Sequence, residues 1–153
     1  MVYISLQDFL RTGILGPVRL GMSRAQVRDV LGDPEHTGGI SRKQRMPTIL
    51  KYGDLEFLYR PGEDHLQAIH MDGFAIPKGS ASMSLDPWIL VGGLALEDAE
   101  KTLDEADIRF TKSRLSYDPS MVVLTSATGV ELGFVREPEE GFDLGLYYIS
   151  KRS

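Results

Sequence analysis

The chain has 153 residues, of which 42% are hydrophobic, and it carries a formal charge of −5 with no cysteine. This length and composition predict one globular domain with a core of useful size. The lack of cysteine excludes disulfides, thiolate chemistry and zinc sites held by cysteine.

The charge is unevenly distributed along the chain. Residues 1–76 hold 9 acidic and 9 basic side chains, whereas residues 77–153 hold 13 acidic and 8 basic ones. Nucleic acids are bound through clustered Lys and Arg, so we expect no nucleic-acid partner. The acidic half would instead attract a partner with a basic surface.

The N-terminal residues, MVYISLQDFL, contain neither a positively charged leader region nor a long apolar core. The longest apolar run covers residues 88–96, whereas a membrane-spanning helix needs about 20 residues. We therefore expect no membrane partner and a cytoplasmic location.

Two short helices are predicted in the first part of the chain. Ser5 has the character of an N-cap and begins one helix, which Gly13 ends. The second helix has the clearest local signal, because Ser23 and Gln26 have the spacing of a capping box. This spacing predicts a helix over residues 24–31.

A loop and three strands are predicted next. Residues 35–47 combine turn formers with a basic cluster, which indicates a loop. Strands are expected at 48–52, 55–60 and 65–71, and apolar and polar residues alternate in the second of them as in a half-buried strand.

The second half of the chain has the same order of predicted elements. A helix is expected over 96–106, followed by strands at 121–125, 130–135 and 144–150. A fixed order that recurs in this way indicates a tandem repeat, in which each unit buries its apolar face against its neighbour.

These observations predict an α+β protein. Each of the two repeats would consist of a helix followed by antiparallel strands. Residues 1–76 would be the first repeat unit, 77–87 a linker and 88–153 the second unit, with both packed as a single domain.

Residues 19–34, RLGMSRAQVRDVLGDP, resemble a motif of the β-lactamase-inhibitor-protein-like fold, which the small lipoprotein of the outer-membrane β-barrel assembly machinery also has. The matching positions are Leu20, Gly21, Met22, Ser23, Val27, Leu31, Gly32 and Pro34. The resemblance implies that the two repeats form one antiparallel sheet with the helices on one face and the other face open. In the inhibitor, that open concave face grips a protein. The second unit departs from the motif, with Ala95 in place of Ser23, and the chain lacks the lipidated cysteine of the lipoprotein.

Strand alternation predicts the side chains of the open face. We expect Phe57, Tyr59, Leu132 and Phe134 in the core, so that their neighbours point the other way. The residues expected to bind a partner are Glu56, Leu58, Arg60, Glu131, Val135 and Tyr147. This face would mix apolar, aromatic and charged groups, and interfaces are built in this way with Tyr and Arg as anchors, although loops could also cover this face.

No catalytic, metal or cofactor site is predicted. His65 and His70 are five residues apart on an expected strand, so they would lie on opposite faces. The segment Gly79–Ser82 lacks the glycine that follows the serine of a nucleophile elbow.

The sequence therefore favours a non-enzymatic module that binds a protein through its open face. The most concrete hypothesis is an intracellular inhibitor, namely an immunity protein that neutralises a cognate bacterial toxin or enzyme. One alternative is a sensor of small molecules or peptides, with a pocket between the repeats; a pocket lined by Trp88 and Tyr148 would favour it. A second alternative is an enzyme with a dispersed site, which buried convergent acids of shifted pKa would favour.

Overall fold

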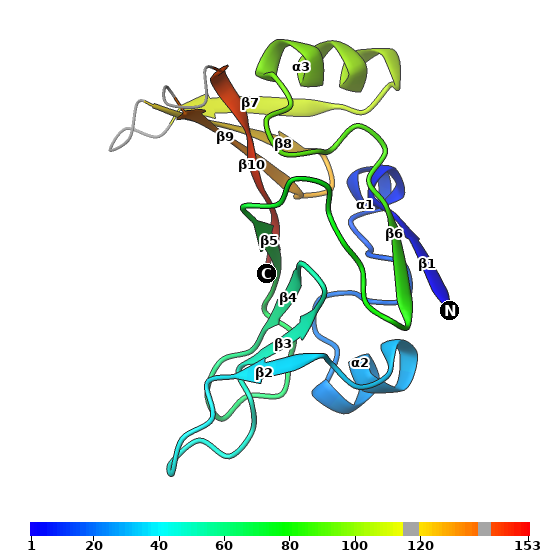
Figure 1. The fold of residues 1–153 in the computed structure, drawn as a ribbon, viewed down its shortest axis with the longest axis vertical. Coiled ribbons are helices and arrows are strands. Elements are labelled where there is room, and N and C mark those ends of the chain that lie inside the picture. The colour runs from blue at the N-terminus through cyan, green and yellow to red at the C-terminus, as the bar shows by residue number, and fades with distance from the viewer. Residues whose placement is uncertain (115–119, 138–141) are drawn as a thin grey trace.

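The computed structural model describes residues 1–114, 120–137 and 142–153, and the fold is α+β (Figure 1). The helices of the described part are α1 (Leu6–Thr12), α2 (Arg24–Leu31) and α3 (Leu96–Glu105). Eight strands form one open antiparallel sheet in the order β2-β3-β4-β5-β10-β9-β8-β7. They are β2 (His36–Gly38), β3 (Ile49–Tyr52), β4 (Leu55–Leu58), β5 (Ala68–Asp72), β7 (Phe110–Arg114), β8 (Met121–Ser126), β9 (Glu131–Glu137) and β10 (Phe142–Arg152).

Local capping explains where the first two helices begin. The Ser5 hydroxyl accepts a hydrogen bond from the backbone N–H of Asp8 at 3.2 Å and starts α1. Ser23 and Gln26 form the predicted capping box of α2, with reciprocal bonds of 3.1 and 2.8 Å. The predicted helix over 24–31 is confirmed, whereas α3 has Ala95 before it and no side-chain cap.

The two halves share their order of elements, and each contributes more strands than predicted. In both, a helix precedes four described strands in sequence, β2 to β5 and β7 to β10, and the halves join where β5 pairs with β10. The expected three strands per half were too few, and the expected loop over 35–47 contains β2. Whether the halves superpose stays a prediction.

The predicted linker also contains a strand. β6 (Met83–Asp86) pairs in parallel with β1 (Val2–Ser5), with Ile4 opposite Leu85. Met83 is buried in the core, which explains why this Ser- and Gly-rich stretch is held against the domain. The expected single sheet is therefore accompanied by a small second one.

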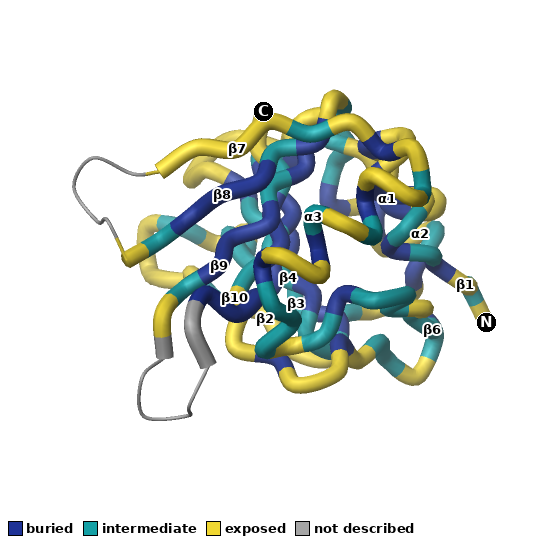
Figure 2. Tube along the Cα trace, turned by 90° about the horizontal axis from the view of Figure 1, so that it is seen from above, coloured by how far each residue is buried: buried dark blue, intermediate teal, exposed yellow. Residues whose placement is uncertain are grey.

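The core lies between the main sheet and the layer formed by the helices and the β1–β6 pair (Figures 1 and 2). The four predicted core residues, Phe57, Tyr59, Leu132 and Phe134, are all buried, as strand alternation predicts. Among the described residues no helix lies on the opposite face of the sheet, so the predicted open face is confirmed at the level of fold.

Candidate functional site

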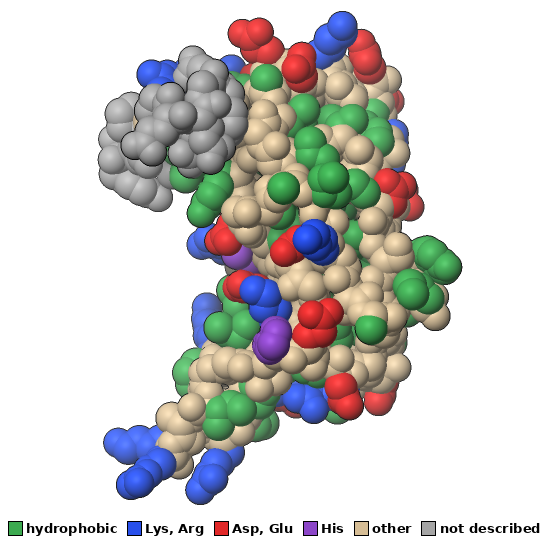
Figure 3. Space-filling model, viewed as in Figure 1, with side chains coloured by type: hydrophobic (Ala, Val, Ile, Leu, Met, Phe, Trp, Pro, Cys, Tyr) green, Lys and Arg blue, Asp and Glu red, His purple; other side chains and the backbone are tan. Residues whose placement is uncertain are grey.

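The open face has a continuous row of side chains that crosses the main sheet. Directly paired residues define this row in every one of the eight strands. From edge to edge it consists of His36, Lys51, Glu56, His70, Ser150, Glu131, Thr125 and Thr111. The molecule is hollowed on this side (Figure 3), so the row crosses a concave surface.

Lysine side chains on β10 and β7 show which face of the sheet packs against the helices. On β10, the Lys151 ammonium donates to the carbonyl of Gly13, at the end of α1, at 3.0 Å. On β7, the Lys112 ammonium lies 3.0 Å from the Glu100 carboxylate on α3. Both lysines therefore point towards the helices. Because successive side chains of a strand point to opposite faces, Ser150, the residue before Lys151 on β10, points towards the open face.

Three predicted site residues lie together around β4. Leu58 and Arg60 line one depression on the open face, and Arg60 is exposed. Glu56 is half-buried, and its carboxylate lies 3.9 Å from the Lys51 ammonium of the adjacent strand. A pair at this distance and exposure contributes little to stability, so it leaves both groups able to meet a partner.

The other three lie on β9 and β10. Glu131 is half-buried opposite Ser150 and Thr125, and Val135 pairs with Met121 on the same face. Tyr147 is 42% exposed, and its carbonyl accepts a hydrogen bond from the N–H of Gly73 at 3.0 Å. The six predicted residues therefore form two groups on the sheet. Glu56, Leu58 and Arg60 lie on or next to β4, whereas Glu131, Val135 and Tyr147 lie on β9 and β10.

Tyr148 is an open-face residue that alternation alone missed. A register shift between Leu146 and Tyr148 places Leu146 opposite Phe134 and Tyr148 opposite Gly133. The bulge breaks strict alternation, so Tyr148 does not follow Leu146 into the core. The flanking glycine was a usable signal, because a Cβ at Gly133 would lie 1.9 Å from a Tyr148 ring carbon.

The centre of the open face carries a polar and aromatic cluster. The His70 and Tyr148 rings have centroids 5.9 Å apart. His70 Nε2 lies 2.9 Å from a carboxylate oxygen of Asp72, two residues further along β5. The contact with Asp72 therefore holds the His70 ring beside Tyr148 in the middle of the sheet.

A basic loop projects from one end of the concave side (Figure 3). Arg42, Lys43 and Arg45 are exposed there, between β2 and β3. The base of this loop is held by Arg24, which is buried at the start of α2. Its guanidinium donates to the carbonyl of Pro47 at 2.7 Å.

The same guanidinium also secures the turn after β4. It donates to the Glu63 carbonyl at 2.6 Å, pairs with the Asp64 carboxylate at 3.0 Å and lies over the Tyr59 ring. Arg24 therefore links α2, the basic loop and the rim of the open face.

Two buried tyrosines attach α2 to the sheet at its two ends. The Tyr59 hydroxyl donates to the Met22 carbonyl at 3.2 Å, and the Tyr52 hydroxyl donates to the Gly32 carbonyl at 2.7 Å. Burial raises the pKa of Tyr52 to about 12, and burial followed by the nearby Asp64 carboxylate raises the pKa of Tyr59 well above its usual value. Both phenols therefore remain neutral donors at physiological pH.

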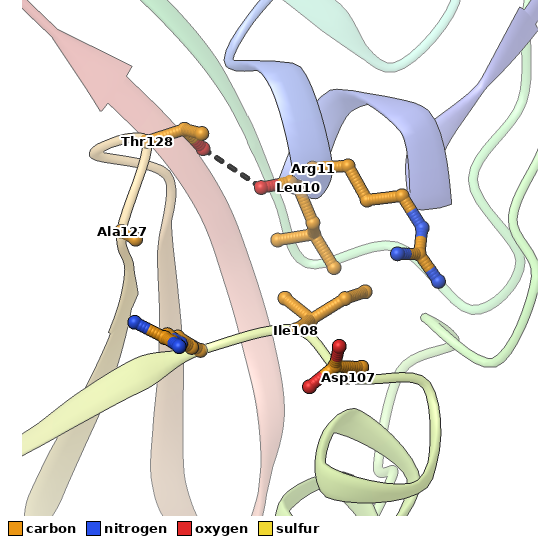
Figure 4. A pocket seen from close by; sticks show the side chains of 7 residues that line it. Leu10, Arg11, Asp107, Ile108, Ala127 and Thr128 are labelled. Carbon is orange, nitrogen blue, oxygen red and sulfur yellow. Dashed lines mark hydrogen bonds between the residues drawn. The ribbon is translucent and has the colours of Figure 1, made fainter.

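A second cavity, of about 220 Å³, lies between the end of α1 and the turns around α3 and β8 (Figure 4). Much of its polar lining is already engaged within the protein. Thr128 donates to the Leu10 carbonyl at 2.7 Å, and Arg11 donates to the Ala106 carbonyl at 2.7 Å. This cavity is therefore a junction of three elements, and its hydrogen bonds serve the fold.

No match was found for the chain among protein-family models, curated proteins or solved structures. The β-lactamase-inhibitor-protein-like resemblance accordingly stays a prediction. Within the described residues, no three His, Asp or Glu side chains are grouped to hold a metal ion. None of the helices in those residues is both long enough and apolar enough to cross a membrane.

Proposed function

We propose that this chain is a non-enzymatic protein-binding module whose partner docks on the open face. The observation that carries the proposal is the row of mixed charged, polar and aromatic side chains across a concave surface that no described helix covers. An antiparallel sheet can leave one face in water, so an uncovered face alone is ordinary. Concavity, partly buried apolar side chains such as Leu58 and Val135, and an exposed Tyr147 are features of interfaces.

Within this class, we favour an intracellular inhibitor, with an immunity protein that neutralises a cognate bacterial toxin as the specific case. The support is the acidic second half of the chain, the lack of a recognisable catalytic motif and the resemblance of residues 19–34 to an inhibitor fold. The product of the neighbouring gene is the partner to test first, because toxin and immunity genes are expected side by side.

The experiment measures binding of that gene product by calorimetry. Arg60→Ala and Tyr147→Ala should each weaken binding by about 30-fold, because interface energy concentrates in a few aromatic and Arg residues. The melting temperature should barely change, since both side chains are exposed. Glu56→Gln and Glu131→Gln should alter the association rate and its salt dependence more than the affinity.

A matched control is available on the helix side. Lys101 on α3 is exposed and makes only a 4.0 Å pair with Glu105, so Lys101→Ala should bind the partner as the parent does. If the open-face variants also bind like the parent, the docking surface is wrongly assigned.

A sensor of small molecules is the second candidate, because one depression of the open face lies where the two halves meet. It is lined by residues of β4, β5 and β10. Neither Trp88 nor Tyr148 lines it or the cavity of Figure 4. A ligand that binds this depression tightly without any protein partner would favour the sensor.

A further inference from the structure

The depression at the junction of the two halves has a volume of about 430 Å³. Leu58 and Ala68 give it an apolar wall. Arg60, two residues after β4, and Arg152, at the end of β10, bring two guanidinium groups to it. Ser150 also lines it. Register places Ala68 opposite Arg152 and His70 opposite Ser150, so the depression crosses the seam between β5 and β10.

The positive groups of this depression lack partners within the described part of the chain. Arg60 and Arg152 are exposed and form no ion pair there. His70, by contrast, is already engaged by the Asp72 carboxylate. The two guanidinium groups therefore remain available for an external acceptor.

Ser150 provides the second, independent observation. Ser150 as a whole is only 1% exposed, and its hydroxyl has no hydrogen-bond partner among the described residues. A buried hydroxyl without a partner costs free energy, and such groups in native proteins call for an explanation. The hydroxyl lies just beneath the surface of the depression that Ser150 lines, so an acceptor seated there would satisfy it once the side chains above it move aside.

We propose that this depression receives the side-chain carboxylate of an aspartate or glutamate of the protein partner. The inference rests on the proposed function and adds the chemistry of the contact. Guanidinium groups match carboxylates in geometry and charge, and Leu58 and Ala68 would contact the methylene groups of the incoming side chain. The nearby Asp72 carboxylate offsets part of the positive charge, so the site suits a monoanion better than a phosphate dianion.

The test needs no partner protein. The whole chain, labelled with ¹⁵N, is titrated with N-acetyl-glutamic acid N-methylamide and followed by NMR. Saturable shifts are expected at the amides of residues 68–70 and 150–152, with a dissociation constant in the range of about 1–10 mM for so small a probe. The uncharged glutamine analogue should bind at least about 10-fold more weakly, because it lacks the charge-assisted bonds.

Three variants locate the contact. Arg60→Gln and Arg152→Gln should each weaken binding of the glutamic acid probe by at least about 5-fold. Arg109→Gln is the matched control, since it makes the same change of charge at the exposed rim of the other cavity, and it should bind like the parent. Equal binding of both analogues, or no effect of the two variants, would overturn the proposal.

Inorganic phosphate serves as the competing probe. Tighter binding of phosphate than of the glutamic acid probe would show a pocket for small anions and overturn the carboxylate assignment. If the probe binds as expected but the gene product does not, the protein partner is refuted while the carboxylate site stands. If the gene product binds and the probe does not, only the carboxylate site is refuted.

Discussion

Two buried serines show how the surroundings of a hydroxyl group decide whether it stabilises or destabilises the folded protein. Ser126 is buried, and its hydroxyl has hydrogen-bond partners. The hydroxyl oxygen lies 2.9 Å from that of Thr128 and accepts a hydrogen bond from the N–H of Val130 at 3.0 Å. Ser150 is buried to a similar degree without such partners. The two residues therefore form a natural pair for comparison.

We predict that Ser150→Ala raises the free energy of unfolding by about 1 kcal/mol, because it removes an unsatisfied buried hydroxyl. The same change should weaken binding of the glutamic acid probe. Ser126→Ala should instead lower the free energy of unfolding by about 1 kcal/mol, since it leaves the Val130 N–H without its acceptor. Urea denaturation of the three proteins checks both signs, and a destabilised Ser150→Ala variant would show that the hydroxyl has a structural role.

At the scale of elements, the β-bulge in the pairing of β9 with β10 depends on the close contact between Gly133 and the Tyr148 ring. An alanine at 133 would place its Cβ 1.9 Å from the ring, so the ring must move. We predict that Gly133→Ala lowers the free energy of unfolding by about 1–3 kcal/mol. Combined with Tyr148→Ala, it should cost much less, and a double-mutant cycle measures this coupling. Simple additivity would contradict the contact.

The attachment of α2 to β3 gives a pH-dependent prediction. The pKa of Tyr52 is raised to about 12 in the folded protein from 10.0, so the folded state retains its proton more strongly than the unfolded state. The stabilisation that the neutral Tyr52 phenol gives the folded state is therefore fully present below pH 10 and is lost as the pH rises through 12. Tyr52→Phe should make alkaline unfolding less steep and cost about 1 kcal/mol at pH 7 through the lost bond to Gly32. Denaturation curves from pH 8 to 12 compare the two proteins; equal slopes would contradict the raised pKa.

At the scale of the whole molecule, the pairing of β5 with β10 unites the two halves. Ile149 on this seam is 1% exposed and lies opposite Met71 of the first half and Leu132 of the second. We predict that Ile149→Ala lowers the free energy of unfolding by about 2–4 kcal/mol. Because both halves share this strand pair, fluorescence of Trp88, the single tryptophan, and far-UV circular dichroism should report the same midpoint in parent and variant. Separate midpoints would show that the halves unfold independently.

Much of this architecture is determined by short-range sequence signals. The capping box at Ser23 and the alternation around Phe57 and Phe134 depend only on neighbouring residues, so α2 and the two faces of β4 and β9 could be predicted. β2 could not, because His36–Gly38 has no apolar pattern and is a strand only through its pairing with β3. β6 was missed for the same reason, since its partner β1 lies far away in the sequence.

Part of the candidate site could likewise be predicted from local sequence, and part of it could not. Alternation by itself placed Glu56 and Leu58 on the face away from the core, because side chains of a strand alternate whatever the strand pairs with. Only the tertiary structure decided that β5 pairs with β10, and hence that Ser150 and Arg152 meet Leu58 and Ala68. Such pairing is made by backbone hydrogen bonds between distant segments, which leave no mark in the local order of residues.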